Sequence, residues 1–100
     1  MGISFGDVAI VTSPAELFVE FGIEIKEQSP FEVTLVAELA NGYCGYVGPE
    51  AAFEQQGYEV HRTLYTCRLA KDSGRRMTDM SIQILEDLQT TEWELPEGLL

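Results

Sequence analysis

A strand–helix–strand pattern over residues 7–39 constrains the fold more than any other feature of this chain. Residues 7–12 (DVAIVT) are apolar and β-branched, with a glycine before them and Ser-Pro after them, as in a buried strand. Residues 31–39 alternate between apolar and polar side chains and predict a second strand. Two strands joined by a helix within this length indicate a βαβ unit with parallel strands. We therefore expect a small α/β layer domain with helices packed on its sheet.

The helix of this unit is predicted to begin at Ser13. Ser13 fits the N-cap position, Pro14 fits the first helical position, and Glu16 completes an S-x-x-E capping box. Apolar residues then recur at helical spacing, at Phe18, Phe21, Gly22 and Ile25. Ser29-Pro30 ends the helix, because the residue before a proline disfavours helical backbone.

In the second strand, the alternation places most of the apolar side chains on one side. That side carries Phe31, Val33, Leu35, Ala37 and Leu39. The other side carries Glu32, Thr34 and Glu38, with Val36 as the apolar exception.

Residues 41–59 (NGYCGYVGPEAAFEQQGYE) form a tyrosine- and glycine-rich stretch after the second strand. It holds three of the four tyrosines and four of the nine glycines. Asn41-Gly42 is a turn dipeptide, and Gly45 and Gly48 allow close backbone approach. The stretch and the Ser13–Glu16 turn both follow strand ends, and open α/β sheets bind ligands at that edge. We expect Glu16 and the tyrosines on the same side of the sheet; the alternative is a surface loop with packed aromatic rings.

The remaining sequence predicts two more helices in a single domain over residues 1–88. Residues 49–56 form a short helix that begins at a proline and stops at Gly57. Residues 60–69 fit a strand or an extended segment. A last helix runs from Asp72 or Ser73 to about Leu88, with an apolar stripe of Met77, Met80, Ile84 and Leu88. Residues 89–100 are predicted to be a tail.

Charge and composition exclude several classes of function. The 100 residues include 17 acidic and 6 basic side chains, a formal net charge of −11. Such a surface repels phosphate backbones and anionic lipid, so we expect no nucleic-acid partner. No apolar run approaches the ~20 residues of a transmembrane segment. The first residues lack the basic region of a signal peptide, so the sequence leaves the compartment open.

Few side chains suggest chemistry when each is taken alone. His61 is the only histidine, and no catalytic triad can be assembled around it. Cys44 and Cys67 have no CxxC spacing, and we interpret them as small apolar residues. Glu16 has a structural explanation in the capping box.

The order of these motifs resembles the C-terminal part of the catalytic domain in the neutral (non-lysosomal) ceramidase family. The shared order is a strand, a Pro-x-Glu turn, a second strand, an Asn-(Gly)-Tyr-x-x-Tyr segment, a short Glu/Phe helix and a Tyr-Glu pair. The resemblance covers about residues 6–88. It implies a zinc amidohydrolase of sphingolipid metabolism, which hydrolyses the N-acyl amide bond of ceramide.

The resemblance also implies roles for three residues. Glu16, in Pro14-Ala15-Glu16, matches a zinc ligand, although Ala15 replaces the family's usual glycine. Tyr46, at the end of the Tyr-x-x-Tyr segment, matches a second zinc ligand. Tyr58, twelve residues later, matches the residue that stabilises the oxyanion of the attacked amide.

The family's two remaining zinc ligands are histidines from an N-terminal part, and nothing in this chain matches them. We therefore expect a C-terminal segment that is inactive as an isolated chain, with the missing part or another copy as its partner. A ceramide-like lipid is the expected substrate of the intact enzyme, and members of the family are often secreted. The alternative is a non-catalytic α/β interaction module that uses the Tyr-Gly loop to bind a partner or itself.

Overall fold

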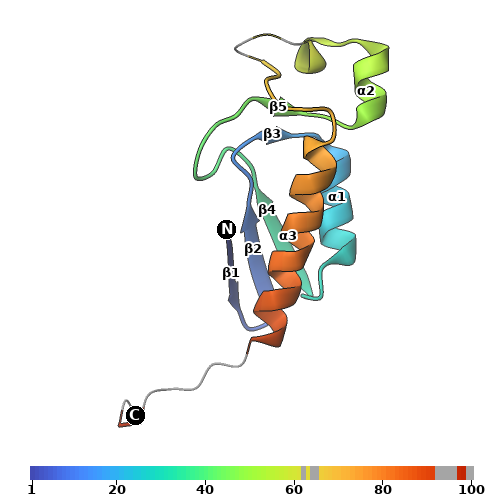
Figure 1. The fold of residues 1–100 in the computed structure, drawn as a ribbon. Helices are drawn as coiled ribbons and strands as arrows, with labels where there is room; N and C mark the ends of the chain where they lie inside the picture. Colours follow the sequence, from blue (N-terminus) through green and yellow to red (C-terminus); the bar gives the residue numbers. More distant parts are fainter. Residues whose placement is uncertain (62, 64–65, 92–96, 99–100) are drawn as a thin grey trace.

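The structure is a computed structural model, and it describes residues 1–61, 63, 66–91 and 97–98. A three-stranded sheet carries two helices on one face, and a small two-stranded sheet lies beyond its end (Figure 1). In chain order the elements are β1 (Gly2–Phe5), β2 (Val8–Thr12), β3 (Glu16–Leu17), α1 (Val19–Gln28), β4 (Val33–Ala37), β5 (Tyr46–Val47), α2 (Glu50–Gln55), a 3₁₀ helix (Tyr58–Val60) and α3 (Ser73–Thr90).

The larger sheet has the strand order β1-β2-β4. Strands β2 and β4 are parallel, with Val8 opposite Val33 and Thr12 opposite Ala37. The predicted parallel pair and the α/β class are therefore confirmed. Strand β1 was not predicted: it pairs antiparallel to β2 after a turn in which Gly6 adopts a φ of 60°, a conformation that favours glycine.

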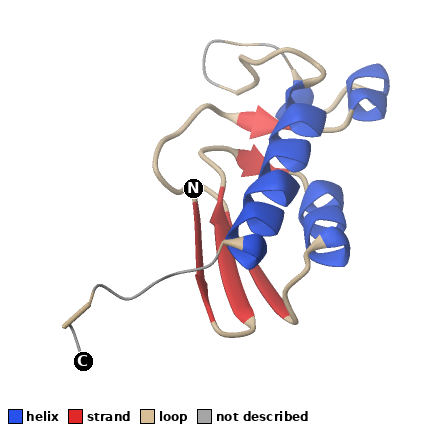
Figure 2. Ribbon diagram, turned by 60° about the horizontal axis from the view of Figure 1, so that its bottom comes forward, coloured by secondary structure: helices blue, strands red, loops and turns tan. Residues whose placement is uncertain are grey.

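The core lies between this sheet and the helices α1 and α3. Figures 1 and 2 show both helices on the same side of the sheet. The buried cluster between the two layers consists of Ala9, Val11, Ile25, Ile82 and Leu85. The strand residues of this cluster, Ala9 and Val11, are two positions apart on β2 and therefore point to the same face of the sheet. Both helices pack on that face.

The predicted start of the first helix is wrong. Helix α1 begins at Val19, and the proposed capping residue Glu16 lies in strand β3 instead. The backbone N–H of Glu16 donates to the carbonyl of Gly45 at 3.0 Å, and that of Phe18 donates to Val47 at 3.0 Å. Pairing with β5 therefore satisfies the N–H of Glu16, which the Ser13 hydroxyl would accept in a capping box. The predicted helix end is confirmed, since α1 stops at Gln28.

Strand β4 alternates as predicted, but its more apolar side is the uncovered one. Val33 and Leu35 are exposed, whereas Thr34 is buried beneath the helices. The Thr34 hydroxyl donates to Ser29 Oγ at 2.5 Å, which satisfies it inside the fold.

Helix α3 is two residues longer than predicted and buries a different stripe. Its buried residues are Gly74, Thr78, Ser81, Ile82 and Leu85, whereas Met80 is 61% exposed. A Cβ at Gly74 would overlap the ring of Phe21. Small residues on α3 thus let α1 pack closely, and this contact, rather than the longest apolar stripe, orients the helix.

The other predicted elements have mixed outcomes. Helix α2 forms where expected, after Pro49. For residues 60–69 the described part contains an isolated antiparallel bridge between Gly45 and Cys67, and the rest of that prediction lies outside the described residues. Most of the predicted tail also lies outside them.

Candidate active site

The parallel pair of β3 and β5 brings two of the three predicted site residues together. Glu16 lies directly opposite Tyr46, and Leu17 lies opposite Val47. Adjacent strands are about 4.8 Å apart, and side chains of paired residues project on the same face. The carboxyl group of Glu16 and the phenol of Tyr46 are therefore neighbours, although they are thirty positions apart in the chain.

Glycines allow the tyrosine loop to run between its neighbours. Gly45 has a φ of 91°, and a Cβ there would overlap the carbonyl oxygen of Thr66. The N–H of Tyr46 donates to the same Thr66 carbonyl at 2.7 Å. Segment 66–67 thus holds β5 from the side opposite β3, and the predicted close approach at Gly45 is confirmed.

Tyr58 joins the pair from the 3₁₀ helix that follows α2. Its ring packs edge-on against the ring of Tyr46, with centroids 6.0 Å apart and planes at 76°. This T-shaped geometry is a favoured arrangement of aromatic pairs. Tyr58 is 69% exposed, so the same ring also faces solvent. All three predicted site residues therefore lie at one end of the fold.

Two residues that were not predicted from the sequence as site residues also belong to this cluster. The hydroxyl of Tyr43 donates to Glu16 Oε2 across 3.5 Å, a long hydrogen bond. The Arg68 guanidinium lies over the Tyr43 ring, 5.9 Å from its centroid. The position of Tyr43, three residues before Tyr46 in one motif, was the signal that could have identified it. Nothing in the local sequence distinguishes Arg68.

Tyr43 and Tyr46 are harder to ionise than free tyrosine. The negative charge of Glu16, and then burial, raises the pKa of Tyr46. Burial, and then Glu16, raises the pKa of Tyr43, while the charge of Arg68 acts in the opposite direction. Both phenols are therefore protonated at neutral pH and can donate hydrogen bonds.

An open cleft of about 520 Å³ adjoins the cluster, lined by Glu16, Leu17, Phe18, Glu38, Tyr46 and Glu59. Glu38 is held in place at its edge, since its Oε2 accepts a hydrogen bond of 3.0 Å from the N–H of Leu17. The lining combines carboxylates with aromatic rings. Its volume falls within the usual range for small-molecule sites.

The cluster does not by itself form a metal site. Within the described residues there is no group of three or more histidine, cysteine, aspartate or glutamate side chains that could hold a metal ion. Glu16 and Tyr46 supply one carboxylate and one protonated phenol, whereas zinc in proteins needs three or four ligands. The donors that the described residues bring together therefore do not by themselves fit a zinc ion.

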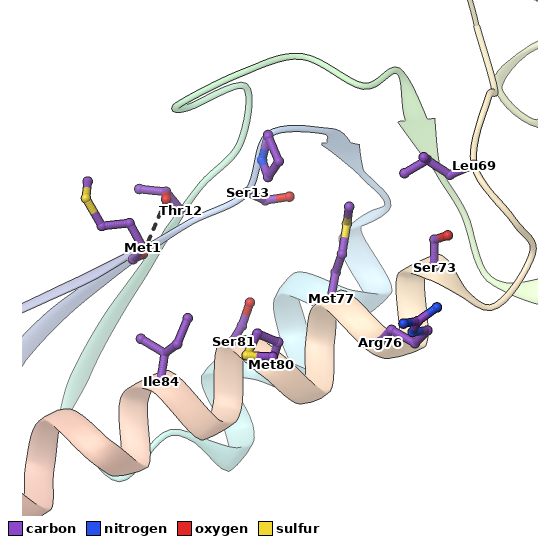
Figure 3. Close-up of a pocket in the computed structure, with 11 residues that line it drawn as sticks. Met1, Thr12, Ser13, Leu69, Ser73, Arg76, Met77, Met80, Ser81 and Ile84 are labelled. Carbon is purple, nitrogen blue, oxygen red and sulfur yellow. Dashed lines mark hydrogen bonds between the residues drawn. The ribbon is translucent and has the colours of Figure 1, made fainter.

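A second cavity, of about 500 Å³, lies between the end of β2 and helix α3 (Figure 3). Met77, Met80 and Ile84 give it an apolar wall. None of Glu16, Tyr46 and Tyr58 lines this cavity, so it is separate from the candidate active site.

Comparisons with protein-family models, with curated proteins and with solved structures each found no match to this chain. In the part of the chain that the structure describes, no helix is both long and apolar enough to cross a membrane.

Proposed function

We propose that this chain is the C-terminal segment of a ceramidase-like zinc amidohydrolase, in which Glu16 and Tyr46 are zinc ligands and Tyr58 stabilises the oxyanion. One observation carries the proposal. Three residues from separate motifs, at positions 16, 46 and 58, lie together in the fold through a strand pair and an aromatic contact. Adjacency of Glu16 and Tyr46 is required of any two ligands of one ion, whose ligand bonds are about 2 Å long.

In this proposal the residues of this chain help to hold the zinc ion and to orient the amide that is attacked. Glu16 provides a carboxylate, and the β3–β5 pairing fixes the backbone of Glu16 beside that of Tyr46. Tyr46 provides a phenol. A cation held by further ligands would lower the pKa of this phenol. Tyr58, whose ring packs against Tyr46, can donate a hydrogen bond to a negatively charged oxygen that develops beside it. In a completed site the zinc would supply Lewis acidity to the amide carbonyl.

Completion requires donors that these 100 residues lack. His61 follows the tyrosine loop and is exposed, and two oxygen ligands hold zinc weakly. In this proposal a further part of the protein supplies the histidines and most of the lipid site. The isolated chain is then inactive toward ceramide.

Hydrolysis of ceramide by the protein encoded in the natural reading frame that contains this segment tests the proposal. Tyr58→Phe should lower kcat by about 100-fold or more, the usual loss for one oxyanion donor. Tyr43→Phe removes a hydroxyl that only helps to position Glu16 through a long hydrogen bond, so it should lower kcat less than Tyr58→Phe does. A chelator should abolish the reaction. Equal activity of Tyr58→Phe and the unmodified protein would refute the role of Tyr58.

A second candidate function is a non-catalytic interaction module. The observation that favours it is the exposure of two loop rings, with Tyr43 55% and Tyr58 69% accessible. Exposed tyrosines suit a protein interface because each joins a large ring to a hydrogen-bonding hydroxyl. Binding of a partner that Tyr43→Ser and Tyr58→Ser weaken, in a protein without zinc or amidase activity, would favour this function over the enzyme.

A further inference from the structure

The larger sheet has an apolar face that neither α1 nor α3 covers. Strand register places six apolar side chains on this face in two rows, Phe5–Val8–Val33 and Ile3–Ile10–Leu35. The four on the outer strands are 59% (Phe5), 46% (Val33), 51% (Ile3) and 50% (Leu35) exposed. We refer to these six residues as the open face.

The helices pack on the opposite face, and the register shows why. Gly2 of β1 faces α3 so closely that a Cβ there would overlap Ile84, whereas its neighbour Ile3 projects to the open face. Strands β1, β2 and β4 contain no charged residue. A sheet face that is exposed to water usually carries polar side chains in alternation, whereas strands with apolar residues on both faces are typical of sheets covered on both sides. The open face therefore has the composition of a buried surface.

We infer that the open face binds the same face of a second copy, giving a symmetric sheet-on-sheet dimer of the 100-residue chain. Stacked sheets lie about 10 Å apart and interdigitate their side chains. A contact related by a two-fold axis uses the same patch on both copies, so an uncharged apolar face is complementary to itself. This inference does not depend on the proposed enzymatic function.

The available area indicates a weak dimer. The four outer side chains expose on the order of 300–400 Å² per copy, given about 150–250 Å² for a fully exposed large side chain. Two copies would bury roughly 600–800 Å² in total, which is less than the about 1,200–2,000 Å² of stable specific interfaces and fits only a weak, transient contact. We expect dissociation constants in the micromolar range rather than the nanomolar range.

The charge of the chain gives the dimer a diagnostic dependence on salt. Each copy carries a net charge of −11. Two exposed acidic residues, Asp7 and Glu32, lie at one end of the open face. The N–H of Val33 donates to the backbone carbonyl of Asp7 at 3.1 Å, which places Asp7 beside this strand. Two copies therefore repel at long range, and salt that screens this repulsion should strengthen association. A basic partner on the same face would show the opposite dependence.

Sedimentation equilibrium of the 100-residue chain tests the inference with a matched pair of substitutions. Val33→Thr replaces a methyl group on the open face by a hydroxyl, whereas Val19→Thr makes the same change at a residue on α1 that is 69% exposed. Because each substitution occurs twice in a symmetric dimer, Val33→Thr should weaken dimerisation at least about tenfold. Val19→Thr should leave it within about twofold. Leu35→Thr is a second open-face variant, and circular dichroism checks that each variant is folded.

The expected result is a dimer that strengthens between about 0.1 M and about 1 M NaCl, where the screening length falls from about 10 Å to about 3 Å. Three results would overturn the inference. They are a monomer at all concentrations up to about 1 mM, a dimer that responds equally to Val33→Thr and Val19→Thr, and association that salt weakens. A monomer that binds a basic amphipathic helix through the open face would assign the surface to such a partner instead.

Discussion

Glu16 lies directly opposite Tyr46 in the parallel β3–β5 pair, so a carboxylate and a phenol share one face of a two-stranded sheet. The pair lies beyond the end of the larger sheet, at the carboxyl ends of β2 and β4 (Figure 1). Tyr58 packs against Tyr46 and Tyr43 donates to Glu16. The carboxylate is the main cause of the raised pKa of Tyr46 and adds to the effect of burial on the pKa of Tyr43, and this coupling is measurable.

Removing the Glu16 charge should lower the pKa of Tyr46. That charge is the main cause of the raised pKa, so Glu16→Gln should move the titration midpoint of Tyr46 downward. The ¹³Cζ resonances of labelled tyrosine report each ring separately. Glu27→Gln, on the exposed last turn of α1, is the control and should leave Tyr46 unchanged. Identical Tyr46 midpoints in all three proteins would show that the two groups do not interact.

The same coupling predicts the alkaline limit of stability. The pKa of Tyr46 and Tyr43 is higher in the folded chain than the ordinary value of about 10, so the folded state holds these protons more tightly. This contribution to stability is fully present below pH 10 or so and is lost as the pH rises through the folded pKa. Urea unfolding at increasing pH should show a decline above about pH 10 that is smaller in Glu16→Gln.

The βαβ unit could be predicted from sequence because its signals are local. Strand alternation and the Ser29-Pro30 helix end each depend on a few neighbouring residues. Strand β1 and the extended path of residues 13–17 depend on pairing with distant segments, namely β2 and β5. The capping motif at Ser13 was therefore outweighed by tertiary hydrogen bonds, which propensity does not include.

The candidate site was predictable in part for a similar reason. The motif order identified Glu16, Tyr46 and Tyr58, and the supersecondary pattern predicted that the first two lie on one side. Tyr43 and Arg68 joined the cluster through the fold of the loop and the return of segment 66–68. Which face of β4 is open also could not be read locally, since its alternation is equally compatible with either orientation.

Substitution of Ser13 distinguishes the observed fold from the capping box. An N-cap serine replaced by alanine costs about 1 kcal/mol. In the structure the Ser13 hydroxyl is buried and has no hydrogen-bond partner among the described residues. Because a buried unpaired hydroxyl costs about 1–3 kcal/mol, Ser13→Ala should leave the free energy of unfolding unchanged or raise it.

Ser29→Ala is the matched control for Ser13→Ala. Ser29 Oγ accepts from the N–H of Phe31 at 3.2 Å and from the Thr34 hydroxyl. Its removal should cost about 1–3 kcal/mol, because Thr34 is then left buried without its acceptor. Urea denaturation measures both variants, and a loss in Ser13→Ala as large as that in Ser29→Ala would contradict this description of residues 13–17.

Two helical glycines should respond oppositely to alanine. At Gly74 the added Cβ would overlap the Phe21 ring between α3 and α1, so Gly74→Ala should destabilise by about 1–3 kcal/mol. At Gly22 no atom of the described residues lies within contact distance of the added Cβ, so Gly22→Ala should stabilise by about 0.5–1 kcal/mol. Thermal unfolding of both variants checks the α1–α3 packing. Equal effects of the same sign would show that the helices do not pack through Gly74.

The isolated chain should bind zinc only weakly and should not hydrolyse ceramide. Glu16 and Tyr46 provide two oxygen donors, and the raised pKa of Tyr46 opposes formation of the phenolate. Isothermal titration should therefore give a zinc Kd no tighter than about micromolar. Binding tighter than that, abolished by Glu16→Ala and Tyr46→Phe, would prove the ligand count wrong. So would chelator-sensitive hydrolysis by the 100-residue chain.

The zinc content of the protein made from the natural reading frame containing these residues is the most direct measure of the proposed site. We expect bound zinc in the unmodified protein, loss of most of it in Glu16→Ala and Tyr46→Phe, and retention in the control Glu27→Ala. Metal analysis after exhaustive dialysis gives the ratio of zinc to protein. A protein without zinc, or one whose zinc content is the same in all four forms, would contradict the claim that Glu16 and Tyr46 are ligands.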